Sequence, residues 1–159
     1  MKILVFSDSH SRSRKIAEVL ERHKGVCDAI VFCGDGIRDM EYIKSKYPSI
    51  AFFMVRGNCD FFEGEYPEEL FVTLDGIKIM IAHGHRYGVK FSLKNIALAA
   101  YENGAQAVFF GHTHTPCDTI EDIKDSRLHL FNPGSIGMSS TYGVVNTSGN
   151  ILVTNIAEI

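Results

Sequence analysis

Aspartate, asparagine and histidine recur along this chain in short polar clusters, each directly after an apolar run. The first cluster is Ser7-Asp8-Ser9-His10, which follows an apolar run that ends at Phe6. An Asp-x-His pair occurs by chance, but five clusters in succession indicate a shared site. The residues in these clusters that could do chemistry are Asp8, His10, Asp35, Asn58, His83, His112 and His114.

These side chains form a ligand set for divalent metal ions. Carboxylates, imidazoles and amides are donors that manganese, iron, zinc, nickel and cobalt accept in proteins. Seven donors exceed the need of one tetrahedral ion, and they suit two ions that share a bridging carboxylate. Two ions ~3.5–4 Å apart recur in phosphatases and nucleases, where they neutralise phosphoryl oxygens and lower the pKa of bound water. The predicted chemistry is hydrolysis of phosphate esters.

Buried strands must position these clusters. Strands predicted over residues 2–6, 29–33 and 50–55, with an amphipathic helix after each of the first two, give a β-α-β-α-β pattern. This pattern is typical of a parallel sheet with right-handed crossovers. Ligands bind at the carboxyl ends of the strands in such sheets, so we expect the clusters to share one rim.

The two helices have identifiable limits in the sequence. Ser11 and Ser13 offer N-caps for the first helix, which Gly25 ends. The second helix closes near Tyr47-Pro48. Its apolar positions at helical spacing are Ile37, Met40 and Ile43.

The second half of the chain is richer in strands. Runs 70–74 and 77–82 flank Asp75-Gly76, the strongest short hairpin signal. A helix is predicted from about Phe91 to Gly104, and a short strand follows over 107–110. Four more strands are predicted over 117–123, 127–131, 142–147 and 151–156. The segment from Asn132 to Ser135, Asn-Pro-Gly-Ser, is a loop with special backbone demands.

Composition narrows the class of protein. A chain of 159 residues fits a single domain, residues 1–159. The net charge of −3 and the pI near 6.1 argue against binding of long nucleic acids. No signal peptide or membrane-length apolar run is visible, and none of the four cysteines forms a C-x-x-C pair. We therefore expect a cytoplasmic protein without a membrane partner.

Five short motifs follow one another along the chain. In order they are Asp8-x-His10, Gly34-Asp35, Gly57-Asn58-x-Asp60, His83-Gly84-His85 and Gly111-His112-Thr113-His114. These motifs resemble those of the calcineurin-like metallophosphoesterase superfamily, and the resemblance extends from Asp8 to about Tyr142. The G-N-C-D motif and the Asn-Pro-Gly-Ser loop resemble its small bacterial and archaeal phosphodiesterase branch. The resemblance implies an α/β fold, a two-sheet β-sandwich flanked by helices in four αββα layers.

The resemblance also implies a metal ligand at each matching position. Two divalent ions per chain are expected, with manganese favoured and nickel, zinc, iron, cobalt and magnesium as alternatives. Asp35 resembles the carboxylate that bridges both ions. The remaining ligands are Asp8, His10 and His114 for the first ion, and Asn58, His83 and His112 for the second.

In the implied mechanism a metal-bridging hydroxide attacks phosphorus. Asp35, which sets the spacing of the ions, and Asn58, which faces the phosphate, are the predicted catalytic residues. Asn58 and His85 are the predicted substrate-binding residues, with a structural role for His85 as the alternative. Cys59 stands where many members of the superfamily carry a histidine thought to protonate the leaving group. A thiol is a poor substitute, which predicts weak dependence on a protein acid and a preference for good leaving groups.

Several alternatives stay open. Arg12, Arg56 and Arg86 lie beside motif loops and could meet a phosphate, although a solvated surface position is favoured for each. Phe61 and Phe62 could line the substrate cleft, form an oligomer contact or lie buried under a loop. The chain could be a homodimer or a homotetramer.

The predicted function is hydrolysis of small phosphodiesters. The main rival is a non-catalytic scaffold, because the same fold resembles the small retromer subunit. That subunit's metal motifs are degraded, whereas every ligand type is present here, which favours an enzyme. A phosphomonoesterase and a metal-dependent nuclease are further alternatives.

Overall fold

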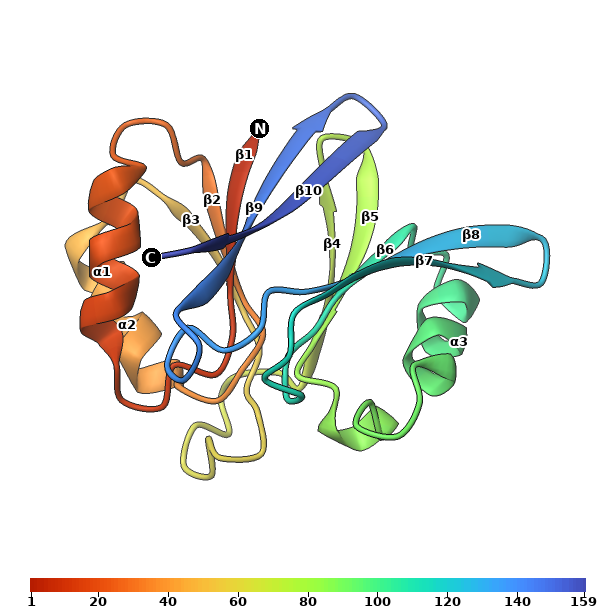
Figure 1. The fold of residues 1–159 in the computed structure, drawn as a ribbon, viewed down its shortest axis with the longest axis horizontal. Helices are drawn as coiled ribbons and strands as arrows, with labels where there is room; N and C mark the ends of the chain where they lie inside the picture. Colours follow the sequence, from red (N-terminus) through yellow and green to blue (C-terminus); the bar gives the residue numbers. More distant parts are fainter.

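The structure, a computed structural model, describes residues 1–159 as two β-sheets packed face to face with helices outside them (Figure 1). β1 pairs with β2, and β2 pairs with β3, all in parallel. This confirms the parallel arrangement predicted for the first half. Its elements are β1 (Lys2–Phe6), α1 (Ser13–Arg22), β2 (Ala29–Phe32), α2 (Ile37–Lys46) and β3 (Ala51–Met54).

The rest of the chain forms the second sheet and completes the first. The strand orders are β10-β9-β1-β2-β3 and β4-β5-β6-β8-β7, with β5, β6 and β8 parallel. The elements are β4 (Glu69–Leu74), β5 (Ile77–Ala82), the 3-10 helix η1 (His85–Tyr87), α3 (Lys94–Glu102), β6 (Ala107–Phe109), β7 (Cys117–Ile123), β8 (Ser126–Asn132), β9 (Thr141–Ser148) and β10 (Ile151–Glu158).

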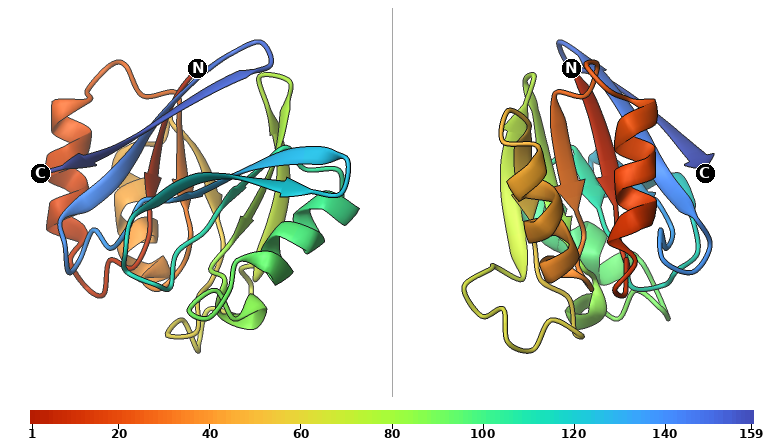
Figure 2. Two further views of the ribbon diagram at one scale, coloured as in Figure 1. Left: turned by 45° about the vertical axis from the view of Figure 1, so that its right-hand side comes forward. Right: turned by 90° about the vertical axis from the view of Figure 1, so that its left-hand side faces the viewer.

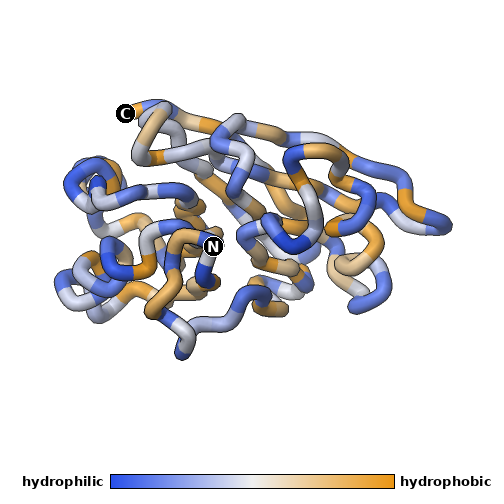
Figure 3. The backbone as a smooth tube through the Cα atoms, turned by 90° about the horizontal axis from the view of Figure 1, so that it is seen from below, coloured by the Kyte–Doolittle hydropathy of each residue, from blue (hydrophilic) through white to orange (hydrophobic).

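Three buried apolar clusters hold four layers together (Figure 2). One cluster lies between the sheets, one joins the first sheet to α1 and α2, and one joins the second sheet to α3. Coloured by hydropathy, the backbone has its apolar stretches inside and hydrophilic stretches in the outer loops (Figure 3). This αββα arrangement confirms the fold expected from the sequence. No helix has both the length and the apolarity that a membrane crossing requires.

Two predicted helix starts are wrong. Arg12, not Ser11 or Ser13, is the N-cap of α1, and no side chain caps that helix. Ser11 has left-handed backbone (φ 65°), whereas an N-cap needs an extended conformation. α3 begins at Lys94 rather than near Phe91, because the preceding residues close a separate turn on the carbonyl of Gly88. Predicted strand limits agree to within two residues.

The hairpin between β4 and β5 forms at the predicted position. Asp75 and Gly76 both have positive φ, 51° and 86°. A type I′ turn needs positive φ at both central residues, and its twist matches that of the flanking strands. The register pairs Leu74 with Ile77 and Glu69 with Ala82, which fixes where β5 ends and the polar loop after it begins.

The core between the sheets can be tested at Phe109. Its ring packs edge-on against Phe131, with centroids 5.6 Å apart, and both side chains are fully buried. We expect Phe109→Ala to lower the free energy of unfolding by about 3–5 kcal/mol, because it leaves a cavity between the sheets. Phe91→Ala is the matched control, since Phe91 is 95% exposed. Equal midpoints in urea unfolding for the two variants would contradict this packing.

Candidate metal centre

The five polar clusters meet at one edge of the sandwich. Each follows the carboxyl end of a strand: β1, β2 and β3 in the first sheet, and β5 and β6 in the second. The strands of each set are parallel, so their carboxyl ends lie on one rim. The loops from both sheets therefore face one another across this rim.

Left-handed backbone is concentrated in these loops. Nine non-glycine residues in the chain have positive φ, and five of them belong to the predicted ligand set. Such backbone is strained for residues with a Cβ atom, and it clusters at functional sites because the surrounding structure must hold it. The five residues are Asp8 (φ 54°), His10 (44°), Asp35 (61°), His112 (67°) and His114 (60°).

Asp8 is fully buried, and its two carboxylate oxygens have different surroundings. Oδ2 accepts hydrogen bonds from Ser7 Oγ (2.5 Å) and from the backbone N–H of His112 (3.1 Å). Oδ1 has no hydrogen-bond partner. A buried carboxylate oxygen without a donor is costly, so this atom fits a cation.

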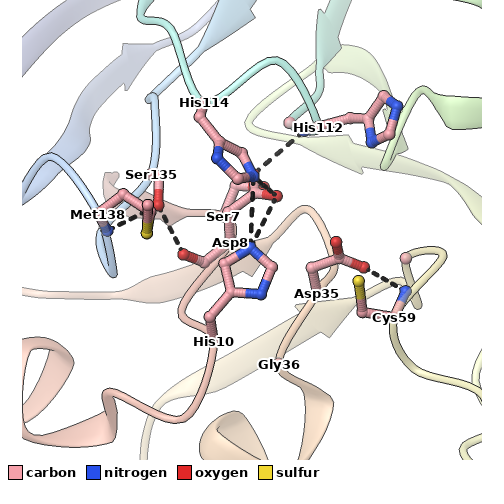
Figure 4. A network of polar contacts seen from close by, with 12 residues as sticks. Ser7, Asp8, His10, Asp35, Gly36, Cys59, His112, His114, Ser135 and Met138 are labelled. Carbon is pink, nitrogen blue, oxygen red and sulfur yellow. Dashed lines mark hydrogen bonds and ion pairs between the residues drawn. The ribbon is translucent and has the colours of Figure 1, made fainter.

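Imidazole nitrogens converge on that free oxygen (Figure 4). Nε2 of His114 lies 3.1 Å from Asp8 Oδ1, and Nε2 of His10 lies 3.8 Å from it. The two Nε2 atoms are 3.3 Å apart and face each other. Ring nitrogens facing each other beside a carboxylate form a donor set that can hold a divalent metal ion.

A second donor group surrounds His83, which is fully buried. Nδ1 of His83 lies 2.7 Å from the carbonyl oxygen of Cys33, which orients the ring. Nε2 then faces Asn58 Oδ1 at 3.1 Å and His112 Nδ1 at 3.2 Å. A metal-binding histidine is typically fixed in this way by a bond from its other ring nitrogen.

Asp35 lies between the two groups. Its Oδ1 accepts the backbone N–H of Cys59 (2.8 Å), and its Oδ2 lies 3.4 Å from His83 Nε2. Asp35 clusters within 4.8 Å with Asp8 and His83, and also with His10 and Cys59. A carboxylate within reach of both groups has the placement that a bridging ligand needs.

The charges at this rim favour a bound cation. Burial disfavours ionisation of Asp35, but the hydrogen bond and charge of His83 together with hydrogen bonds from Cys59 outweigh it and hold the pKa of the carboxyl well below its usual range. Burial opposes protonation of His83, yet the carboxylates of Asp35 and Asp8 raise its pKa. Burial and the neighbouring His83 lower the pKa of His112 to about 4. At neutral pH the Asp35 carboxylate is therefore ionised, and the neutral His112 ring has a lone pair for a metal.

Asp60 organises this rim, although the sequence reading gave it no role. Its buried carboxylate accepts four backbone N–H groups, at 2.8 Å from Asp35, 2.9 Å from Gly36, 3.0 Å from Ile37 and 2.8 Å from Gly57. A side chain at Gly57 would collide with the Asp35 carboxylate. The aspartate of the G-N-C-D motif therefore ties the loop after β3 to the loop after β2.

The Asn-Pro-Gly-Ser loop also supports the candidate site. The sequence indicated special backbone demands for this loop but no role. Ser135 Oγ donates to the backbone carbonyl of Asp8 (2.8 Å). Asn132 Nδ2 donates to the carbonyl of Gly111 and to Thr113 Oγ1, both at 3.0 Å. The loop after β8 therefore fixes the two loops that carry the first donor group.

His85 and two arginines lie beside the second donor group. The rings of His85 and His83 have centroids 5.5 Å apart, and His85 Nδ1 is buried without a hydrogen-bond partner. His85, Arg56 and Arg86 line a hollow of about 600 Å³. Both arginines pair with Glu68, at 2.9 Å and 2.6 Å, so a single carboxylate is shared by two guanidinium groups.

Comparison with known proteins identifies the family. Residues 1–150 match the model of the calcineurin-like phosphoesterase superfamily domain. This chain belongs to that superfamily. It is 34% identical over 137 residues to the probable metallophosphoesterase YsnB of Bacillus subtilis, covering 86% of this chain and 75% of that protein. The family and the donor groups together indicate divalent metal ions and phosphoester hydrolysis.

Solved structures share the fold. A predicted phosphoesterase from Streptococcus pneumoniae superposes with a TM-score of 0.81 at 29% identity, covering 99% of this chain and 88% of that one. Vacuolar Protein Sorting 29 from Cryptosporidium parvum gives 0.78 at 15% identity, with 99% and 91% covered. A protein described as a novel archaeal phosphodiesterase gives 0.72 at 20% identity, with 99% and 100% covered. At 15% and 20% identity the likeness concerns the fold alone.

The supporting role of Asp60 can be tested by substitution. Asp60→Ala removes the acceptor of four N–H groups, and we expect it to lower the free energy of unfolding by about 3 kcal/mol or more in chelated protein. Asp122→Ala is the control, because that carboxylate is 86% exposed. The measurement is urea unfolding in the presence of a chelator. A loss no larger than that of Asp122→Ala would refute the role.

Proposed function

We propose that this protein is a two-metal phosphodiesterase acting on small diesters. The observation that carries the proposal is the fully buried Asp8 carboxylate, whose Oδ1 has no donor and faces imidazole nitrogens. Asp35 lies within reach of both donor groups. The donor set of two carboxylates, four imidazoles and one amide fits two divalent ions.

Each ion has its own donor group in this proposal. When bound, the two ions would neutralise phosphoryl oxygens and supply a nucleophile by lowering the pKa of water. Manganese is the ion we would test first, because it accepts mixed oxygen and nitrogen donors. Asp35 would serve both ions. Asp8, His10 and His114 would hold the first ion, and Asn58, His83 and His112 would hold the second.

The side chains around the ions position the substrate. Asn58 Nδ2 makes only a long contact with Cys59 Sγ (3.4 Å), so its N–H groups are free to donate to a phosphoryl oxygen. The bond from His83 to the Cys33 carbonyl keeps its ring from turning during the reaction. We assign His85, which lines the hollow beside the second donor group, to contact with the substrate.

One observation supports diesters as the substrate: a protein described as an archaeal phosphodiesterase shares the fold. Cys59, in place of the histidine that many members of the superfamily carry, favours substrates with good leaving groups. The net charge of −3 disfavours long nucleic acids.

We further propose that residues 1–159 work as one domain in the cytoplasm, where the four free cysteines stay reduced.

The proposal predicts metal-dependent hydrolysis of bis(p-nitrophenyl) phosphate. Chelated protein should be inactive, added Mn²⁺ should restore turnover, and the diester should be preferred over p-nitrophenyl phosphate. Asp35→Asn should lower the affinity for Mn²⁺ by at least about tenfold, measured by calorimetry, because one charge is lost between the two groups. Asp122→Asn, a substitution at an exposed carboxylate, is the control.

The other outcomes of these measurements would change the proposed function. A preference for the monoester would keep the metal centre and change the substrate class to phosphomonoesters. Normal turnover in metal-loaded Asp35→Asn would refute the site. Absence of metal binding would favour a scaffold, a role consistent with the fold shared by Vacuolar Protein Sorting 29.

A separate prediction concerns Cys59. Burial and the neighbouring Asp35 carboxylate raise the pKa of its thiol to about 11, which makes it a weak acid at neutral pH. We expect Cys59→Ala to retain kcat/KM for bis(p-nitrophenyl) phosphate within about threefold, since that leaving group needs no protonation. A collapse of turnover with intact Mn²⁺ binding would contradict this and make the thiol part of the chemistry.

A further inference from the structure

Two phenylalanines beside the metal centre are left uncovered by the fold. Phe61 is 78% exposed and Phe62 is 87% exposed, so the alternative that they lie buried under a loop is wrong. They directly follow Asp60, whose carboxylate ties this loop to Asp35. Adjacent aromatic side chains at the edge of a functional site are a costly feature unless something binds to them.

The loop that carries these rings is firmly held. Asp60 anchors its start through four backbone N–H groups. Glu63 anchors its middle, because its nearly buried carboxylate accepts Arg38 Nε (2.7 Å) and the backbone N–H of Phe62 (3.0 Å). The exposure of the two rings is therefore a property of a fixed loop conformation.

The rings border a hollow that opens onto the metal centre. Its volume is about 310 Å³, at the lower end of the range for small-molecule sites. His10 and Asp35, two of the proposed ligands, line it together with Cys59. A group bound here would be attached to a phosphate held at the centre. Arg38 also lines the hollow, and its guanidinium lies over the Phe62 ring, 6.0 Å from the ring centroid.

We propose that this hollow binds an aromatic ring of the substrate, such as a nucleobase, through stacking on Phe61 and Phe62. The inference rests on the proposed function, since it places the substrate's phosphate at the metal centre. Phenyl faces attract flat π-systems more than alkyl chains. Arg38 presents a second flat, cationic surface, and its side chain is 74% exposed and tethered only through Nε. Its remaining N–H groups can donate to ring nitrogens or carbonyls.

The test compares two ligands that differ only by the base. Adenosine 5′-monophosphate and ribose 5-phosphate have the same sugar and phosphate, and calorimetry on Mn²⁺-loaded protein gives Kd for each. We expect tighter binding of the nucleotide by roughly tenfold, within the range measured for stacking on aromatic side chains. Phe61→Ala/Phe62→Ala should reduce this ratio to near one and leave Kd for ribose 5-phosphate unchanged.

Two further variants make the result specific. Phe91→Ala removes a phenylalanine that is 95% exposed and lies outside the hollow, so it should keep the full preference. Phe61→Leu/Phe62→Leu keeps apolar side chains and removes the π faces. The leucine variant should lose most of the preference for the nucleotide over ribose 5-phosphate. It replaces the alanine variant in the test if that variant folds poorly.

Each contrary result has its own meaning. Equal Kd values for both ligands in the unsubstituted protein would overturn the aromatic subsite while leaving metal-dependent diester turnover intact. Weaker ribose 5-phosphate binding in the double variant would assign the rings to the centre itself and overturn the inference. A change in sedimentation mass without a change in preference would assign the rings to a contact between copies. Failure of both ligands to bind, in protein that also lacks turnover, would refute the proposed function.

Discussion

The buried carboxylate of Asp8 is the constraint around which the rest of the site is arranged. Ser7 and the backbone of His112 satisfy one of its oxygens, and nothing in the chain donates to the other. An uncompensated charge in this position would cost several kcal/mol. Imidazole nitrogens of His10 and His114 face this oxygen, and a neutral imidazole carries no charge that could compensate it. A cation between these groups would stabilise the arrangement.

The fold meets this requirement by bringing two parallel sets of strand ends to one rim. Three strands of the first sheet and two of the second end there, and the apolar cluster between the sheets fixes their relative position. The left-handed backbone at Asp35 and at Asp8 is held by hydrogen bonds to Asp60 and from Ser135, which come from other loops. The proposed ligands come from five loops, so their positions depend also on residues such as Asp60 and Ser135 that are not ligands themselves.

The sequence predicted correctly those elements that depend on residues adjacent in the chain. Apolar runs predicted the strands, and Asp75-Gly76 predicted the hairpin, because each depends on adjacent residues. It was uninformative where long-range pairing decides: nothing local places β8 between β6 and β7. The turn before α3 and the short helix η1 lack periodicity, so the start of α3 was predicted too early and η1 was missed. Likewise, residue types reveal donors such as His114, but not that Asp60 acts through four backbone bonds.

The loop from Asp60 to Glu63 connects the proposed metal ligands with the two phenylalanines proposed to select the substrate. A two-metal centre attracts any phosphate ester, because it acts on phosphoryl oxygens that all such esters share. Discrimination must come from groups that contact the organic part of the substrate, and those groups are useful only at a fixed distance from the metals. Asp60 sets that distance here, since the carboxylate that orders Asp35 also begins the segment carrying Phe61 and Phe62. Substitutions at the two rings could therefore change which ester is bound while leaving the position of the proposed metal ligands unchanged.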